Sequence, residues 1–297
     1  MRVAGVEIDG AVAVGGGDIC SAVRGTLDGA AAFAKTRADA PAEFFAAEAR
    51  GRKLLDVDGG PPLPRVLAVG DDGLVLEWVD PGRAGVAAAQ ELGRALARMH
   101  QASPGAFGAE TGGFIGSLPL DNAAAPDWPT FYAERRLAPY LPSLPADVRR
   151  QVERLCQGLQ EVAGPPEKPA RIHGDLWSGN VLWAADGRAW LVDTASAHGG
   201  HRETDLAMLM LFGAPCLEEI LAAYDDEWPL AAGWRERVPL HQLHPLLVHA
   251  VMFGGSYLSR SAHVVERLLR RDLSDAGVAI ATPASDNSAE SVSGETP

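Results

Sequence analysis

Lysine is scarce in this chain: only three of its 26 basic residues are lysines. They are Lys35, Lys53 and Lys168. The acidic residues number 39, which leaves a net charge of −13. This balance argues against a nucleic acid or an anionic membrane as partner, because both require clustered positive charge. Since the chain otherwise uses arginine, a lysine inside an apolar segment is a candidate for a specific role.

Cysteines and long apolar segments are also few. The three cysteines are Cys20, Cys156 and Cys216, an odd number of residues that lie far apart. A disulfide framework or a Cys-x-x-Cys zinc site is therefore not expected, and a reducing compartment fits this pattern. The apolar stretch 206–217 is too short to cross a bilayer. Glu7 and Asp9 interrupt the segment in which a signal peptide needs an apolar core. We expect a cytoplasmic protein.

The first eighty residues indicate strands around one helix. Pro41 is expected to open a helix over residues 42–56, which are rich in Ala, Glu, Arg and Leu. The turn Asp28-Gly29 is a strong hairpin signal. The predicted strands, bounded by turn residues, are 11–14, 22–27, 30–35, 66–69 and 74–78. We therefore predict a small antiparallel sheet with one helix, occupying residues 1–79.

Helices are expected to dominate the rest of the chain. The predicted helical segments are 87–100, 131–137, 147–162 and a long region from 204 to 271. Three short strands are expected at 170–173, 181–184 and 189–192, and residues 103–129 should form an irregular loop. Residues 272–297 contain few apolar side chains and should be a disordered tail. The chain is thus predicted to be α+β, with a mainly helical second lobe at residues 80–271.

The strongest chemical signal is the segment His-Gly-Asp-Leu-Trp-Ser-Gly-Asn at residues 173–180. It is followed thirteen residues later by Asp193, at the end of an apolar strand. Phosphoryl transfer from ATP needs a carboxylate beside the attacking hydroxyl group and oxygen ligands for Mg²⁺. Asp175 would accept the proton of the hydroxyl group, and Asn180 and Asp193 would hold the metal. Each residue alone could simply cap a turn, but the joint spacing favours a kinase.

The N-terminal residues can be tested against this hypothesis. Lys35 ends the third predicted strand, and Glu48 lies in the middle of the following helix, where it could hold that lysine against the phosphates. Glu43 is an alternative partner, but in the first helical turn it would more simply interact with the helix dipole. Glycine amides around Gly16, Gly17 and Asp18 could cover the phosphates. Backbone groups of Glu77 and Val79, where the lobes join, could bind adenine.

These residues together resemble the fructosamine (ketosamine) 3-kinase family, which is similar to aminoglycoside phosphotransferases and choline kinases. The motif at 173–180 and the segment Gly-Gly-His-Arg-Glu-Thr-Asp-Leu at 199–206 carry most of the resemblance, which covers nearly everything before the tail. It implies a two-lobed protein-kinase-like fold and ATP- and Mg²⁺-dependent phosphorylation of the 3-hydroxyl of a free or protein-bound ketosamine. It further implies that Asp205 anchors the backbone of the catalytic loop. The phosphorylated adduct would then release its amine.

The acceptor side and the substrate stay more open. Trp177 is the expected sugar-facing aromatic residue, and His201, Glu203 and Tyr257 are further substrate candidates. The sequence departs from the family in having Thr194 after the metal-binding Asp, where a proline is usual. Cys20 and Ser21 are also unusual at their positions, and these departures leave the preferred ketosamine open. An aminoglycoside or other small-alcohol phosphotransferase and a catalytically inactive nucleotide-binding module are the alternatives.

Overall fold

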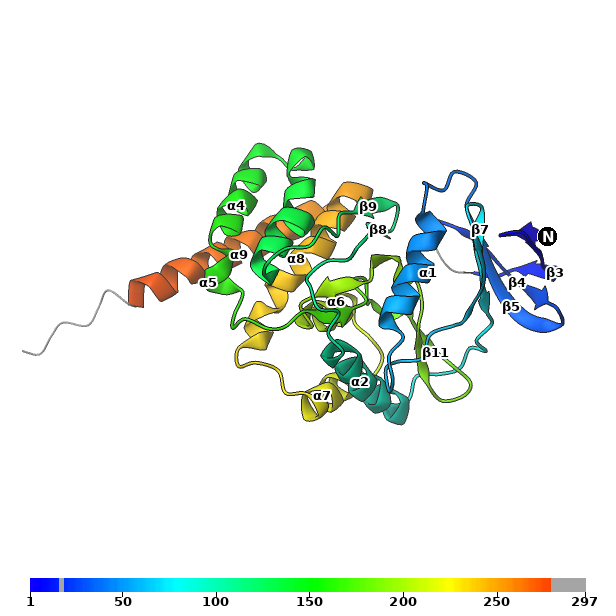
Figure 1. Ribbon diagram of the computed structural model, residues 1–297. Helices are drawn as coiled ribbons and strands as arrows, with labels where there is room; N and C mark the ends of the chain where they lie inside the picture. Colours follow the sequence, from blue (N-terminus) through cyan, green and yellow to red (C-terminus); the bar gives the residue numbers. More distant parts are fainter. Residues whose placement is uncertain (16–18, 279–297) are drawn as a thin grey trace, which may run out of the picture.

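The computed structural model describes residues 1–15 and 19–278 (Figure 1). An antiparallel sheet forms the N-terminal part and helices make up most of the C-terminal part, so the predicted α+β class is confirmed. Among the described residues, no helix combines the length and the apolar character that a membrane span requires. Gly16, Gly17 and Asp18, three candidates for phosphate binding, lie outside the described residues.

The N-terminal sheet has five strands in the order β3-β4-β5-β7-β6. They are β3 (Asp9–Ala13), β4 (Ser21–Leu27), β5 (Ala30–Thr36), β6 (Val66–Gly70) and β7 (Gly73–Glu77). The predicted turn between β4 and β5 has positive φ angles at Asp28 and Gly29, as a tight hairpin turn requires. A further hairpin, β1 (Arg2–Val3) with β2 (Val6–Glu7), precedes the sheet. Because side chains alternate along a strand, β5 buries Ala32 and Ala34 in one core and directs Phe33 and Lys35 to the other face.

Helix α1 (Phe44–Leu55) covers that second face and stands between the sheet and the helical part (Figure 1). Phe44 and Phe45 pack with Leu74 and Leu76 of β7. The predicted start of the helix near Pro41 was too early: Glu43 has left-handed backbone angles, so the regular helix begins only at Phe44. The sheet and α1 therefore meet through aromatic and aliphatic side chains, with Glu48 on the buried side of the helix.

The C-terminal part is built around packed helices, of which α2 lies against α7, and α8 against both α6 and α9. The α-helices are α2 (Val86–Gln101), α3 (Trp128–Phe131), α4 (Ala146–Gln157), α5 (Leu159–Val162), α6 (Glu203–Phe212), α7 (Leu217–Glu227), α8 (Trp234–Phe253) and α9 (Ser256–Val278). Shorter helical turns are the π-helix η1 (Tyr132–Leu137) and the 3-10 helices η2 (Ala138–Ser143), η3 (Ser178–Asn180) and η4 (Thr194–Ser196).

Several boundaries differ from the sequence-based expectation. The segment expected to be irregular, 103–129, contains the hairpin β8 (Gly113–Ile115) with β9 (Leu118–Leu120). The helix predicted over 147–162 is interrupted at Gly158, which separates α4 from α5. Helix α9 continues to Val278, past the expected end at residue 271, and residues 279–297 of the expected tail lie outside the described residues.

Two small antiparallel pairs lie where the sheet and the helices meet, and they carry the predicted motif. β10 (Ala170–Ile172) pairs with β13 (His198–Gly200), and β11 (Val181–Trp183) pairs with β12 (Ala189–Leu191). The motif at 173–180 connects β10 to β11, and Asp193 follows β12. The two pairs thus bring both ends of the predicted catalytic segment together beneath α1.

Candidate active site

Three charged side chains from separate elements contact one another. They are Lys35 of β5, Glu48 of α1 and Asp193 of the segment after β12. The Lys35 ammonium lies 2.5 Å from a carboxylate oxygen of Glu48 and also donates a hydrogen bond to Asp193. Lys35 and Glu48 are buried, whereas the Asp193 side chain is 54% exposed. Burial alone would lower the pKa of Lys35, but the two carboxylates outweigh it and raise that pKa, so the side chain stays an ammonium ion.

Asp205, on the first turn of α6, holds the backbone of the predicted catalytic loop. Its two carboxylate oxygens accept hydrogen bonds from the backbone N–H groups of His173 (2.7 Å) and Gly174 (2.9 Å). The ring of His173 bonds in turn to the carbonyl oxygen of Val192, at 2.8 Å. The loop is therefore fixed from both sides, by α6 and by the segment that carries Asp193.

Asp175 lies on this loop, partly buried and beside Asn180. The Asn180 amide donates to the backbone oxygen of Asp175 at 2.8 Å and lies 3.4 Å from its carboxylate. Burial, together with the negative charges of Asp193 and Asp205, raises the pKa of Asp175 to about 7. A carboxylate whose pKa is close to neutral pH is suited to accept a proton from a hydroxyl group.

Asn180 and Asp193 offer oxygen atoms that fit a divalent cation. They stand at neighbouring ends of the β11–β12 pair, where the N–H of Val192 donates to the carbonyl of Asn180 at 3.1 Å. Since the Asn180 amide nitrogen is used by Asp175, its oxygen is available for a cation. Asp193 adopts left-handed backbone angles, φ 58° and ψ 55°, which are rare for a non-glycine residue and common at functional sites. The donor set of carboxylate and amide oxygens suits Mg²⁺.

At the end of β7, the side chain of Glu77 is held within the N-terminal part of the protein. Its carboxylate accepts hydrogen bonds from the backbone N–H (2.9 Å) and guanidinium (2.6 Å) of Arg65. The N–H groups of Glu77 and Trp78 donate to the carbonyls of Arg65 and Ala31 within the sheet. Any ligand contact at the end of β7 would thus use other backbone groups.

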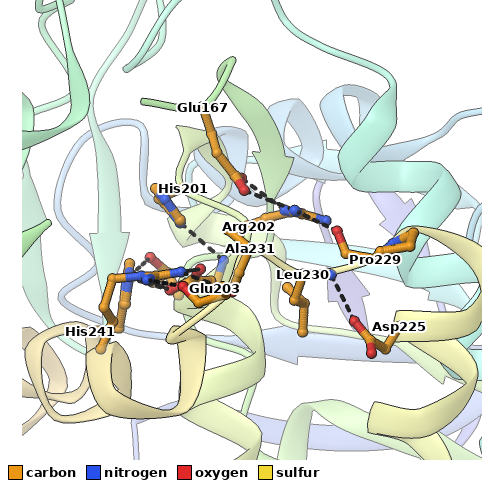
Figure 2. Close-up of polar contacts among 12 residues, drawn as sticks. Glu167, His201, Arg202, Glu203, Asp225, Pro229, Leu230, Ala231 and His241 are labelled. Atoms are coloured by element: carbon orange, nitrogen blue, oxygen red, sulfur yellow. Dashed lines mark hydrogen bonds and ion pairs between the residues drawn. The ribbon is translucent and has the colours of Figure 1, made fainter. Parts of the chain in front are cut away.

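The structure gives no support to the substrate roles expected for His201 and Glu203, because both side chains are buried against other residues of the C-terminal part. Glu203 receives two hydrogen bonds from Arg237, at 2.6 and 3.0 Å, and lies 3.3 Å from the ring of His241 (Figure 2). Burial would raise the pKa of Glu203, but bonds from His241 and Arg237 lower it to about 2. His201 packs against Trp128 and His241, with ring centroids 4.9 Å apart in both pairs.

His201, Glu203 and His241 also present ligand atoms within 4.8 Å of one another, as a metal site would. However, Arg237 occupies both oxygens of Glu203 and already supplies the positive charge that a cation would bring. The adjacent Arg202 pairs with Glu167 at 2.8 Å (Figure 2). These ion pairs bind the start of α6, and with it Asp205, to α8 and to the segment before β10.

An exposed strip of aromatic side chains begins at the predicted catalytic loop. Trp177 and Phe212, which are 41% and 36% exposed, meet edge to face with ring centroids 6.2 Å apart. Phe212 contacts His249 at 5.1 Å, and His249 contacts Phe253 and Tyr257 at 5.5 and 4.9 Å. The predicted substrate residues Trp177 and Tyr257 thus belong to one surface. The sequence did not predict a role for Phe212 or Phe253. Phe212 is the last residue of α6 and Phe253 the last residue of α8, and no motif marks either of them.

A sheet over a helical body, a lysine held by two carboxylates and an Asp–Asn loop below it together define a kinase-like phosphotransferase. An aminoglycoside phosphotransferase shows the same fold, with a TM-score of 0.58 over 89% of this chain and 95% of that chain, at 17% identity. This likeness establishes the fold alone.

The sequence comparisons give the family. The profile of fructosamine kinases matches residues 2–271, and the chain belongs to that family. A probable ketoamine kinase of Enterococcus faecium is 35% identical over 265 residues, covering 86% of this chain and 94% of that protein. A probable ketoamine kinase of Thermus thermophilus is 36% identical over 260 residues, covering 87% and 94%. The crystal structure of a putative fructosamine-3-kinase from Thermobifida fusca has a TM-score of 0.83 at 44% identity, over 90% of this chain and 96% of that one.

Proposed function

We propose that this protein is an ATP-dependent ketosamine 3-kinase, which phosphorylates the 3-hydroxyl of a ribulosamine or fructosamine. The observation that carries the proposal is the meeting of Lys35, Glu48 and Asp193 above the loop of Asp175. The names of the relatives support the substrate class, since the proteins from Enterococcus faecium and Thermus thermophilus are both called probable ketoamine kinases. Phosphorylation would destabilise the adduct and release the amine.

The nucleotide end uses charges that the fold already holds in place. Lys35, oriented by Glu48, binds phosphate oxygens of ATP as an ammonium ion. Asn180 and Asp193 would hold Mg²⁺, which neutralises the charge of the phosphates when it is bound. Since the N–H groups of Glu77 and Trp78 are used within the sheet, the Glu77 carbonyl and the Val79 N–H are our candidates for adenine.

The acceptor end requires a base in line with the sugar hydroxyl group. The Asp175 carboxylate accepts the proton of the sugar's 3-hydroxyl group. The oxygen of that hydroxyl group forms a bond to the γ-phosphorus of ATP at the same time. The bond between that phosphorus and the bridging oxygen breaks, and ADP leaves with the electron pair. The amide of Asn180 and the backbone bonds from His173 and Gly174 to Asp205 keep the loop in this position.

The surroundings of Asp175 favour a ketosamine over an aminoglycoside. A polycationic acceptor needs several free carboxylates around the base, but Glu203 is buried and neutralised by Arg237. The exposed surface that adjoins the loop is instead the aromatic strip from Trp177 to Tyr257. Aromatic faces suit the apolar face of a sugar and a single ammonium group.

We further propose that residues 1–79 are the nucleotide-binding lobe and 80–271 the catalytic lobe, because the sheet and α1 lie before residue 80 and the loop of Asp175 lies after it. A cytoplasmic location is proposed as well. It is supported by the thiols of Cys20, Cys156 and Cys216, all of which are free.

The test is ADP release measured against a panel of acceptors: ribulose-lysine, fructose-lysine and kanamycin. We expect Mg²⁺-dependent turnover with the two ketosamines, a phosphate on O3 by NMR, and no turnover with kanamycin. Asp175→Asn is the matched inactive control. Turnover with kanamycin alone would replace the proposed substrate while leaving the chemistry of the site unchanged.

A further inference from the structure

Thr194 occupies the position directly after Asp193 and is 3% exposed. Its hydroxyl group donates a hydrogen bond to the backbone carbonyl of Glu48, at 2.8 Å and without contact to solvent. The bond spans 146 positions of the sequence and joins the turn η4 to the middle of α1. Thr194 therefore connects the two residues that flank the Lys35 ammonium.

Gly51, one turn further along α1, allows the helix to approach the backbone of Thr194 closely. A Cβ atom at this position would lie 1.8 Å from the carbonyl oxygen of Thr194 and 3.1 Å from the Cβ of Ala197. Glycine inside a helix costs roughly 1 kcal/mol relative to alanine, so its presence calls for a packing reason. Here the reason is the direct approach of α1 to η4. The hydroxyl group and the carbonyl group of Thr194 thus both contact the same face of α1.

The other side of η4 is held as well. The Ser196 hydroxyl donates to the backbone oxygen of Phe114 in β8 at 2.5 Å. The ring of Phe114 meets that of Phe44, the first residue of α1, at 5.1 Å. Helix α1, turn η4 and strand β8 therefore form a closed set of contacts, in which the Thr194 bond is the link nearest to the site.

The backbone of η4 does not itself require threonine. Thr194 is the first residue of a 3-10 helix, a position at which even proline is well tolerated, so the turn can form without a threonine side chain. Nor does the Glu48 carbonyl require the bond, since it lies inside α1, where the helix supplies its own N–H donors. The hydrogen bond between the Thr194 hydroxyl and the Glu48 carbonyl therefore adds a direct link between η4 and α1, beyond the bonds that form each element.

We propose that Thr194 is a positioning residue which, with Gly51, fixes α1 against the segment of Asp193 and so fixes the two ion pairs of Lys35. The proposal rests on the proposed function in so far as Lys35 and Asp193 bind nucleotide and metal. It predicts that helix α1 and the Asp193 segment move as one unit, so that the nucleotide meets a preformed arrangement of charges.

The test uses the full-length protein and two readouts: the Kd for Mg²⁺ with AMP-PNP by calorimetry, and the kcat with fructose-lysine. Thr194→Val keeps the shape but removes the donor, and we expect the Kd to rise about two- to tenfold, as for the loss of one hydrogen bond. Thr194→Ser keeps a hydroxyl group and should lie close to the wild type. Gly51→Ala must separate helix and turn, so its Kd should rise further.

Gly93→Ala is the matched control for Gly51→Ala. It is also a helix glycine, in α2, and its Cβ would lie 2.2 Å from the carbonyl oxygen of Ile220, at the contact between α2 and α7. We expect it to lower the Tm without changing the Kd. If Gly51→Ala and Gly93→Ala both change only the Tm, or if Thr194→Val binds and turns over like the wild type, the proposal is wrong.

A double-mutant cycle separates positioning from general stability. Glu48→Gln keeps the backbone carbonyl that Thr194 contacts but weakens the ion pair with Lys35. If Thr194 acts through that pair, Thr194→Val should have little further effect on the Kd in the Glu48→Gln background. Fully additive effects would overturn the proposal. A wild-type protein that binds no nucleotide would instead refute the proposed function.

Discussion

Three buried histidines should each contribute a loss of unfolding free energy as the pH falls below about 6.5. Burial lowers the pKa values of His198, His201 and His244 well below the usual 6.5, and neighbouring cations add to the effect. Arg136 is one such cation, and it faces both His198 and His244. These rings therefore stay neutral in the folded protein and take up protons only when it unfolds.

The direction of this change in unfolding free energy follows from proton linkage. Below pH 6.5 the unfolded chain binds more protons than the folded one at these sites, so the free energy of unfolding decreases with pH. From pH 7.5 to 5.5 each histidine contributes a loss of about 1.4 kcal/mol, and the three together about 4 kcal/mol. Asp175 and Glu48, whose pKa values are both raised to about 7, take up protons in the folded protein over this range and offset most of the loss.

A comparison of variants removes that offset. His244→Gln keeps a polar side chain near Tyr140 but cannot titrate, so on acidification from pH 7.5 to 5.5 it should gain about 1.4 kcal/mol relative to the wild type. Urea unfolding followed by tryptophan fluorescence at each pH measures this difference. A difference between His244→Gln and wild type that is constant over this range would refute the reasoning.

Three further predictions concern single side chains. Asp175→Asn should lower turnover by about 10²–10⁴-fold with little change in nucleotide affinity, as single-turnover kinetics and calorimetry can show. Asp193→Ala should abolish Mg²⁺-supported nucleotide binding; a titration with unchanged Mg²⁺ dependence would contradict the assignment. Arg237→Met should cost about 3–5 kcal/mol of unfolding free energy, because it removes the guanidinium that neutralises the buried Glu203 carboxylate. Arg94→Met, which breaks an exposed pair, should cost less than about 1 kcal/mol in the same urea titration.

The parts of the site that could be predicted are those with a local pattern. The strand ending at Lys35, the helix carrying Glu48 and the motif around Asp175 each combine a clear periodicity or spacing with one chemically distinctive residue. The structure brings these segments together because β5 and α1 are neighbours in the chain and pack face to face. The catalytic roles of these residues stay predictions until the variants are measured.

The parts that could not be predicted depend on distant partners. Glu203 stands in a polar motif shortly after Asp193, and Arg237, 34 positions later in the chain, makes it part of a buried ion pair. The hairpin β8–β9 was missed because three-residue strands are too short to show alternation. The role proposed for Thr194 was equally invisible, since its partner Glu48 is 146 positions away and contributes a backbone atom.

The protonated state of Lys35 protects it against glycation in an enzyme that works among reducing sugars. Ketosamines arise when an unprotonated amine attacks a sugar carbonyl, and Lys35 is the lysine that the proposed chemistry could least afford to lose in this way. Its burial and its two carboxylate partners keep the lone pair protonated, so it is a poor nucleophile. The other two lysines, Lys53 and Lys168, are exposed and lie outside the proposed site. Spontaneous glycation of this protein would therefore fall on side chains whose modification leaves catalysis intact.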